Sequence, residues 1–186
     1  MVSPRVYQSA RDISMSKTFF YFAYGSNLCR PRLEARIGPA PVVGAAALDR
    51  HRLAFHKNGQ DGSAKCDAFH TDDENDSLWG AVYQVTLEQR KTLDVVEGVG
   101  NGYEVKTVDV VLQKRSIEII LYIAQEHHID SELVPYDWYH AFVLHGAHSH
   151  KLPMNYVNAI RRVSVQPDGD RRRAAENQQI LQIEPA

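Results

Sequence analysis

The chain has 186 residues, of which 44% are hydrophobic, so it can form one domain with a buried core. Its formal net charge of −2 argues against nucleic acid as a main partner, because duplex binding needs a cationic surface. No apolar stretch is long enough to span a bilayer, so no membrane partner is expected. Two cysteines, Cys29 and Cys66, are too few for a secreted disulfide scaffold, and we expect a cytoplasmic protein.

The chain ends differ in composition from the middle. Residues 1–17 lack the continuous apolar core of a signal peptide, and we expect a mobile N-terminal extension there. One domain is predicted over residues 18–165, followed by a polar C-terminal tail over residues 166–186 that forms a solvated helix or a loose segment. The arginine cluster at 171–173 is too small a patch to indicate nucleic-acid binding.

The apolar and aromatic residues 18–24 predict a strand that ends in the polar turn Gly25-Ser26-Asn27. Gly25 can adopt a positive φ, and the side chains of Ser26 and Asn27 can bond to nearby backbone. Such a turn can leave several N–H groups pointing at one spot, which suits an anion or a developing oxyanion. An ordinary strand-ending turn is the alternative interpretation.

Short elements are predicted in the next part of the chain from their apolar runs and turn residues. They are a helix over 28–37, strands over 42–48 and 51–55, a loop over 58–65, a solvated acidic turn over 72–76 and a strand over 78–85.

Thr86 and Gln89 have the spacing of a capping box, which predicts a helix that begins at Leu87 and ends near Glu97, where Gly98 can stop it. Glu97 then lies at a helix end beside a glycine-rich turn, where a carboxylate can be aimed into a cleft. A surface glutamate at a helix end is the alternative.

The C-terminal third predicts a hairpin followed by two helices. Residues 103–112 and 117–124 form the two arms of the hairpin, and a helix is expected from Pro135. On that helix, residues from Tyr139 to Ala147 recur with the spacing of one apolar face, so Tyr139 lies in the core or lines a pocket that satisfies its hydroxyl. The small Gly146 on the same helix allows another segment to approach closely.

In their order and separation, these segments resemble the gamma-glutamylcyclotransferase family over residues 18–165. Two of the family's motifs are intact and two depart from its pattern. The intact motifs are the Tyr-Gly-Ser-Asn-Leu loop at Tyr24 to Leu28 and the Glu-Gly-Val element at Glu97 to Val99. The Pro-Ser-x-x-Tyr element matches Pro135 to Tyr139, with Tyr136 in place of serine. The Gly-Ala…Leu-Pro…Tyr tail matches Gly146-Ala147, Leu152-Pro153 and Tyr156, with His150-Lys151 where a glycine is usual.

The resemblance implies an α+β fold, a mostly antiparallel, closed or nearly closed β-barrel with flanking helices. It implies cleavage of a γ-glutamyl amide by its own α-amine, which gives 5-oxoproline and a free amine or amino acid without metal, water or cofactor. Glu97 is then the catalytic acid and base. The substrate-binding residues implied are Tyr24, Gly25, Ser26, Asn27, Leu28, Tyr103 and Tyr139.

The expected partner is therefore a small-molecule γ-glutamyl substrate, and a homodimer is one assembly left open. Two alternatives remain. A related cyclotransferase would act on γ-glutamylamines or on a γ-glutamylated biosynthetic intermediate, and a non-catalytic binding module would keep the fold alone. Specificity for the leaving group is expected to lie in the loops at 58–65 and 125–132, which carry no readable code.

Rival chemistry rests on histidines and cysteines. His140, His145, His148 and His150 crowd one helix and its exit, but no His-Glu-x-x-His is present, and no metal site is expected. Cys29 follows the glycine loop closely and can face the cleft, although a cysteine nucleophile would need a base beside it.

Overall fold

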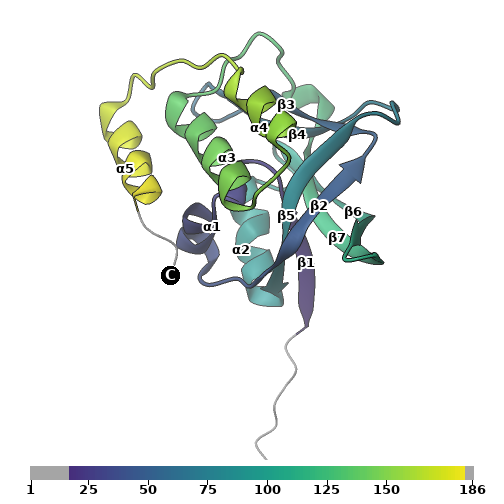
Figure 1. Ribbon diagram of the computed structural model, residues 1–186. Coiled ribbons are helices and arrows are strands. Elements are labelled where there is room, and N and C mark those ends of the chain that lie inside the picture. Colours follow the sequence, from purple (N-terminus) through teal and green to yellow (C-terminus); the bar gives the residue numbers. More distant parts are fainter. Residues whose placement is uncertain (1–16, 183–186) are drawn as a thin grey trace, which may run out of the picture.

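The computed structural model describes residues 17–182 (Figure 1). The N-terminal extension predicted over residues 1–17 lies outside the described residues, apart from Lys17. Within the described range, no helix is long and apolar enough to cross a membrane.

A five-stranded sheet carries the fold, with the strand order β2-β5-β1-β7-β6. Its central strand, β1, pairs antiparallel with β5 along its whole length and parallel with β7. A separate pair, β3-β4, completes the β-structure. The strands are β1 (Thr18–Ala23), β2 (Val42–Asp49), β3 (His51–Asn58), β4 (Ala64–His70), β5 (Ser77–Thr86), β6 (Tyr103–Leu112) and β7 (Arg115–Ala124).

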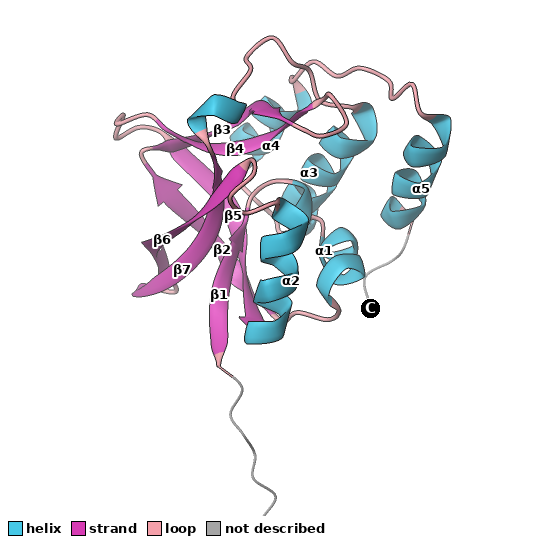
Figure 2. Ribbon diagram, turned by 180° about the vertical axis from the view of Figure 1, so that it is seen from behind, coloured by secondary structure: helices cyan, strands magenta, loops and turns pink. Residues whose placement is uncertain are grey.

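The helices gather mainly on one side of the curled sheet (Figure 2). They are α1 (Arg30–Ile37), α2 (Leu87–Glu97), α3 (Asp137–Ser149), α4 (Met154–Arg161) and α5 (Arg171–Leu181), with 3₁₀ turns at Ser26–Leu28 and Glu126–His128. The α+β class and the mostly antiparallel pairing that the resemblance implies are confirmed.

The resemblance implied a closed or nearly closed barrel, and closure is wrong, because the sheet curls but stays open. Its edge strands, β2 and β6, approach each other through side chains. A Cβ on Gly44 of β2 would lie 3.0 Å from Leu112 Cδ1 on β6, yet no ladder of hydrogen bonds joins these strands in the described range. We refer to this contact between β2 and β6 as the seam.

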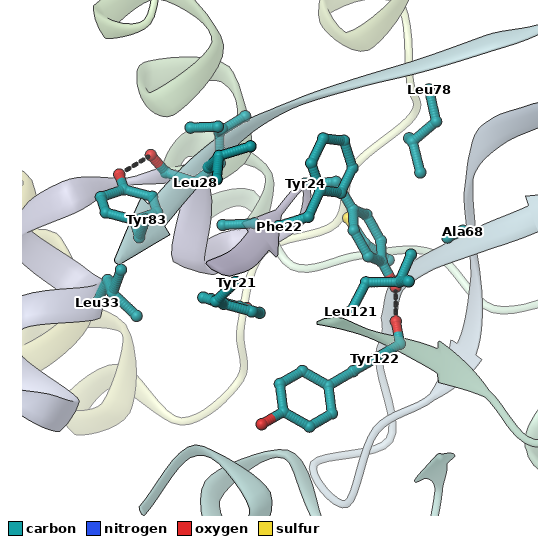
Figure 3. Packing of buried hydrophobic residues seen from close by; sticks show 14 of the residues in the cluster. Tyr21, Phe22, Tyr24, Leu28, Leu33, Ala68, Leu78, Tyr83, Leu121 and Tyr122 are labelled. Atoms are coloured by element: carbon teal, nitrogen blue, oxygen red, sulfur yellow. Dashed lines mark hydrogen bonds between the residues drawn. The ribbon is translucent and has the colours of Figure 1, made fainter. Parts of the chain in front are cut away.

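The core combines buried side chains of the sheet with those of the helices α1 to α4, and Figure 3 shows some of them packed together. Phe22, Tyr83, Leu121 and Phe142 are among its fully buried side chains. Each large apolar side chain buried in this way contributes about 1.5–3 kcal/mol to folding. The end of β1 is thereby held within the buried core.

Helix α2 follows the sequence prediction closely. Thr86 and Gln89 form both hydrogen bonds of the capping box, and Gly98 ends the helix in the left-handed region with φ 69°. Strand β4, by contrast, was not predicted, and it begins within the expected loop. Ala64, Cys66 and Ala68 are small residues with little strand character, so the sequence does not indicate a strand there.

The polar segment after residue 165 contains a helix, α5, whose start is fixed to α3. Asp168 is buried; it accepts hydrogen bonds from the indole Nε1 of Trp138 at 2.8 Å and from Arg173 Nε at 2.6 Å. These contacts hold α5 against the body of the domain (Figure 1).

Candidate active site

Strand β1 leads directly into the 3₁₀ turn Ser26–Leu28. Gly25 has φ −95°, so the expected positive φ is not what the turn requires. A side chain is excluded there by space instead, because a Cβ would lie 3.1 Å from Cys66 Cβ. The N–H groups of Gly25, Ser26 and Asn27 have no hydrogen-bond acceptor among residues 17–182, since a helix start leaves its first donors unpaired. The turn therefore presents free donors.

Glu97, the last residue of α2, is fixed through a single carboxylate oxygen. Asn27 Nδ2 donates to Glu97 Oε1 at 2.8 Å, and Arg36 Nη1 donates to the same oxygen at 3.1 Å. Asn27 also donates to the Tyr21 hydroxyl at 2.9 Å and accepts from Arg36 at 2.7 Å. Glu97 Oε2 has no donor in the described part of the chain. This oxygen is free to exchange a proton with a bound molecule.

The turn and Glu97 share a narrow pocket of about 30 Å³, which we call the inner pocket. It brings together every residue that the sequence predicted for the site except Leu28. Its lining is Tyr21, Tyr24, Gly25, Ser26, Asn27, Cys66, Glu97, Tyr103, Tyr122 and Tyr139.

Leu28 supports the turn from behind and does not line the inner pocket. It is fully buried, and its carbonyl oxygen accepts a hydrogen bond from His150 Nε2 at 3.1 Å. A Cβ on Gly146 of α3 would lie 2.4 Å from the Leu28 carbonyl carbon. The predicted close approach to Gly146 is therefore real, and the segment that approaches is the turn itself.

The pocket tyrosines use their hydroxyls to hold the surrounding strands. Tyr103 donates to the Cys66 carbonyl at 2.5 Å, and Tyr139 accepts from the Cys66 N–H at 3.0 Å. Tyr24 donates to the carbonyl of Tyr122, as Figure 3 shows. Burial raises the pKa of the five tyrosine hydroxyls of the pocket, so they stay protonated: those of Tyr21, Tyr24, Tyr103, Tyr122 and Tyr139. They shape the pocket as neutral groups.

Cys66 lines the inner pocket, whereas Cys29, which the sequence allowed to face the cleft, does not. Burial raises the pKa of the Cys66 thiol and of the Cys29 thiol. The thiolate is the nucleophilic form of cysteine, so neither residue is poised for attack at neutral pH.

The inner pocket opens into a wider cavity of about 380 Å³, which we call the vestibule. The two share Ser26, Glu97, Tyr103 and Tyr139. Residues Gly59 to Asp61, from the loop expected to govern the leaving group, also line the vestibule, as do the side chains of Arg32, Arg36, Lys57 and Lys65. A molecule with one end in the inner pocket would place its other end among these cations.

The histidines near α3 take part in separate contacts. His140 Nε2 lies 2.8 Å from the Ile160 carbonyl oxygen, and His150 bonds to Leu28 and lies 2.8 Å from the Tyr83 hydroxyl. Within residues 17–182 no group of three or more His, Cys, Asp or Glu side chains is arranged to hold a metal ion. The absence of a metal requirement stays a prediction.

Comparison with known proteins finds one matching family model and several similar proteins. The model of the AIG2-like family matches residues 77–160. The gamma-glutamylcyclotransferase of Bos taurus is 26% identical over 166 residues, which is 86% of this chain and 85% of that protein. The gamma-glutamylcyclotransferase of Homo sapiens is 28% identical over 152 residues, which is 79% of each.

Solved structures share the fold over nearly the whole described chain. A gamma-glutamyl cyclotransferase has a TM-score of 0.78 at 24% identity and covers 90% of this chain and 100% of its own. An uncharacterized protein from Homo sapiens has a TM-score of 0.75 at 25% identity and covers 89% and 99%.

The curled sheet with its flanking helices is thus a gamma-glutamylcyclotransferase-like fold. The sequence matches agree with it, and the resemblance to the gamma-glutamylcyclotransferase family that the motifs indicate is confirmed.

Proposed function

We propose that the protein is a gamma-glutamylcyclotransferase that releases 5-oxoproline from a γ-glutamyl amide, with Glu97 as its catalytic acid and base. The observation that carries the proposal is the free Oε2 of Glu97, whose other oxygen is fixed by Asn27 and Arg36 beside the unpaired N–H groups of the turn. A base and an anion receptor then meet in one pocket.

The reaction needs two protons to move. The α-amine of a γ-glutamyl group is an ammonium at neutral pH, and Glu97 would take the first proton to make it a nucleophile. The amine then attacks the γ-carbonyl carbon and closes a five-membered ring, while the C–N bond to the leaving amine breaks. Glu97 passes the first proton to the departing nitrogen, and the second α-nitrogen proton follows, so that the products are a lactam and an ammonium.

The turn would stabilise charge during the ring closure. Its free N–H groups suit the oxyanion of the tetrahedral intermediate or the substrate α-carboxylate. Holding the γ-glutamyl chain folded lowers the activation barrier through proximity, by up to about 7–11 kcal/mol in the best intramolecular cases. The neutral tyrosines and the narrow pocket favour a compact, folded chain.

The direct test is an assay for 5-oxoproline with γ-glutamyl amino acids and γ-glutamylamines as donors. A donor whose α-amine is acetylated serves as the control, because its amide nitrogen is a poor nucleophile. We expect 5-oxoproline from the free donor and no product from the blocked one. Enzyme-dependent N-acetylglutamate from the blocked donor would show hydrolysis and overturn the proposal.

A further inference from the structure

Lys57 is a buried cation with no partner of its own. The residue is 7% exposed, and its ammonium lies 4.8 Å from the centre of the Tyr103 ring. No oxygen in the described range accepts a hydrogen bond from Lys57 Nζ, although it lines the vestibule. The stem of Lys57 is buried, while its ammonium faces the vestibule without a hydrogen-bond partner among the described residues and is placed to bind an anion that enters there.

The local backbone is built to place this ammonium in the vestibule. The register of β3 and β4 shifts between Phe55 and Lys57, and such bulges re-aim side chains beside functional sites. Gly102 leaves the necessary room, since a Cβ there would lie 2.8 Å from Lys57 Nζ. Lys57 also faces Lys65 across the strand pair, and Asp61, the anion beside them, is bonded to Lys65 and not to Lys57.

The other charges of the vestibule are largely paired. Arg36 bonds to Glu97, and Lys65 Nζ lies 2.7 Å from Asp61 Oδ2. Arg32 donates to the neutral Asn177 through Nη1, and its buried Nε has no partner. Four cations and two carboxylates therefore leave two positive charges, those of Lys57 and Arg32, without a countercharge.

We propose that Lys57 is a specificity-determining residue that, with Arg32, selects leaving amines bearing two carboxylates, so that the preferred donors are γ-glutamyl derivatives of acidic amino acids. This rests on the proposed function. The γ-glutamyl end of a donor is a zwitterion, so it leaves the net charge of the site unchanged. The single carboxylate of an ordinary leaving amino acid would neutralise one of the two cations, and a second carboxylate on its side chain neutralises the other. γ-Glutamylamines, which carry neither carboxylate, fit this vestibule worst.

The test compares donors of the same shape and different charge. γ-Glutamyl-glutamate and γ-glutamyl-glutamine differ only in the side-chain carboxylate, and the rate of 5-oxoproline formation gives kcat/KM for each. We expect the wild type to favour the acidic donor by at least about tenfold, the scale of one charged hydrogen bond. Equal values in the wild type would overturn the inference without any variant being made.

Lys57→Met removes the charge while keeping a long apolar stem against Tyr103. We expect the preference for the acidic donor to fall at least about tenfold, with circular dichroism unchanged. Lys91→Met, which removes a charge from an exposed site on α2, should keep the wild-type ratio. An equal fall with both donors in Lys57→Met would overturn the inference and indicate that Lys57 acts on the reaction in general.

The same measurements separate the two proposals. Release of 5-oxoproline from both donors with equal efficiency would contradict the selection by Lys57 and leave the cyclotransferase activity standing. No 5-oxoproline from either donor, or from any other γ-glutamyl compound, would contradict the activity itself and the selection with it.

Discussion

Glu97 is bound through Oε1 alone, so one substitution can separate its position from its chemistry. Glu97→Gln keeps an oxygen for Asn27 and Arg36 but has no group that can take a proton. We expect 5-oxoproline turnover to fall at least about a hundredfold, the usual scale for losing a general base. The matched control is Glu88→Gln, an exposed glutamate on the same helix. Near-normal turnover in a folded Glu97→Gln protein would refute the assignment.

His150 makes the stability of the turn dependent on pH. Burial lowers the pKa of His150, so the folded state favours the neutral ring. The unfolded ring keeps its ordinary pKa of about 6.5 and binds more protons as the pH falls below that value. The contribution of His150 is therefore complete above about pH 6.5 and is lost on acidification.

Urea unfolding at pH 5 and pH 7.5 checks this expectation. The loss of stability between the two pH values should be smaller in His150→Gln than in the wild type, because glutamine does not titrate. The same loss in both proteins would mean that protonation of other groups accounts for it.

Single residues of the site were predictable from the sequence only where they lie in motifs. The positions of Glu97 and of the turn from Tyr24 to Asn27 follow from helix-end and strand-end signals, whereas their assignment to a site came from the resemblance; the structure places them in one pocket. Arg36 and Lys57 were missed, since a cation on a short helix or strand usually points to solvent. Their orientation depends on a bulge and on distant partners, which no local pattern encodes.

At the scale of elements, the contact between α3 and the turn is the most constrained feature. Gly146→Ala would drive a methyl group into the backbone of Leu28, and we expect a loss of about 1–3 kcal/mol in the free energy of unfolding. Turnover should also fall, because the turn would shift relative to Glu97.

Gly169→Ala provides the matched comparison, because a Cβ at Gly169 meets nothing within 4 Å. Urea denaturation of both variants, with the 5-oxoproline assay alongside, measures the difference. Equal stabilities for the two variants would show that α3 can move away from the turn at little cost.

Elements with strong local signals were predictable, and β4 was not. The capping box at Thr86 and Gln89 fixes the start of α2 through hydrogen bonds within four residues. Strand β4 holds small residues around the buried Asp67, whose carboxylate accepts from the Ala124 N–H at 2.7 Å. Because aspartate is rare in strands, Asp67 weakens the sequence signal for β4. The contact that stabilises this aspartate comes from a distant strand, which pattern analysis cannot detect.

For the whole molecule, the sequence could indicate the class of fold but not whether the sheet closes. Closure depends on hydrogen bonds between β2 and β6, whose residues are far apart in the chain and have ordinary strand composition. The resemblance implied a closed or nearly closed barrel, and the structure shows two edges that approach each other, as at Gly44 and Leu112, without a hydrogen-bonded ladder in the described range.

We expect amide hydrogen exchange to be fastest in the strands of the seam. Amide protons exchange with solvent fastest where opening breaks the fewest hydrogen bonds, and β2 and β6 each have an unpaired edge there. Strand β1, which lies between β5 and β7 and carries the turn at its end, should exchange more slowly than these edges. Deuterium uptake that is as fast in β1 as in β2 would contradict this order. The seam involves Leu112 at the end of β6, whereas the pocket residue Tyr103 stands at its start, so mild denaturant should open the seam before it lowers turnover.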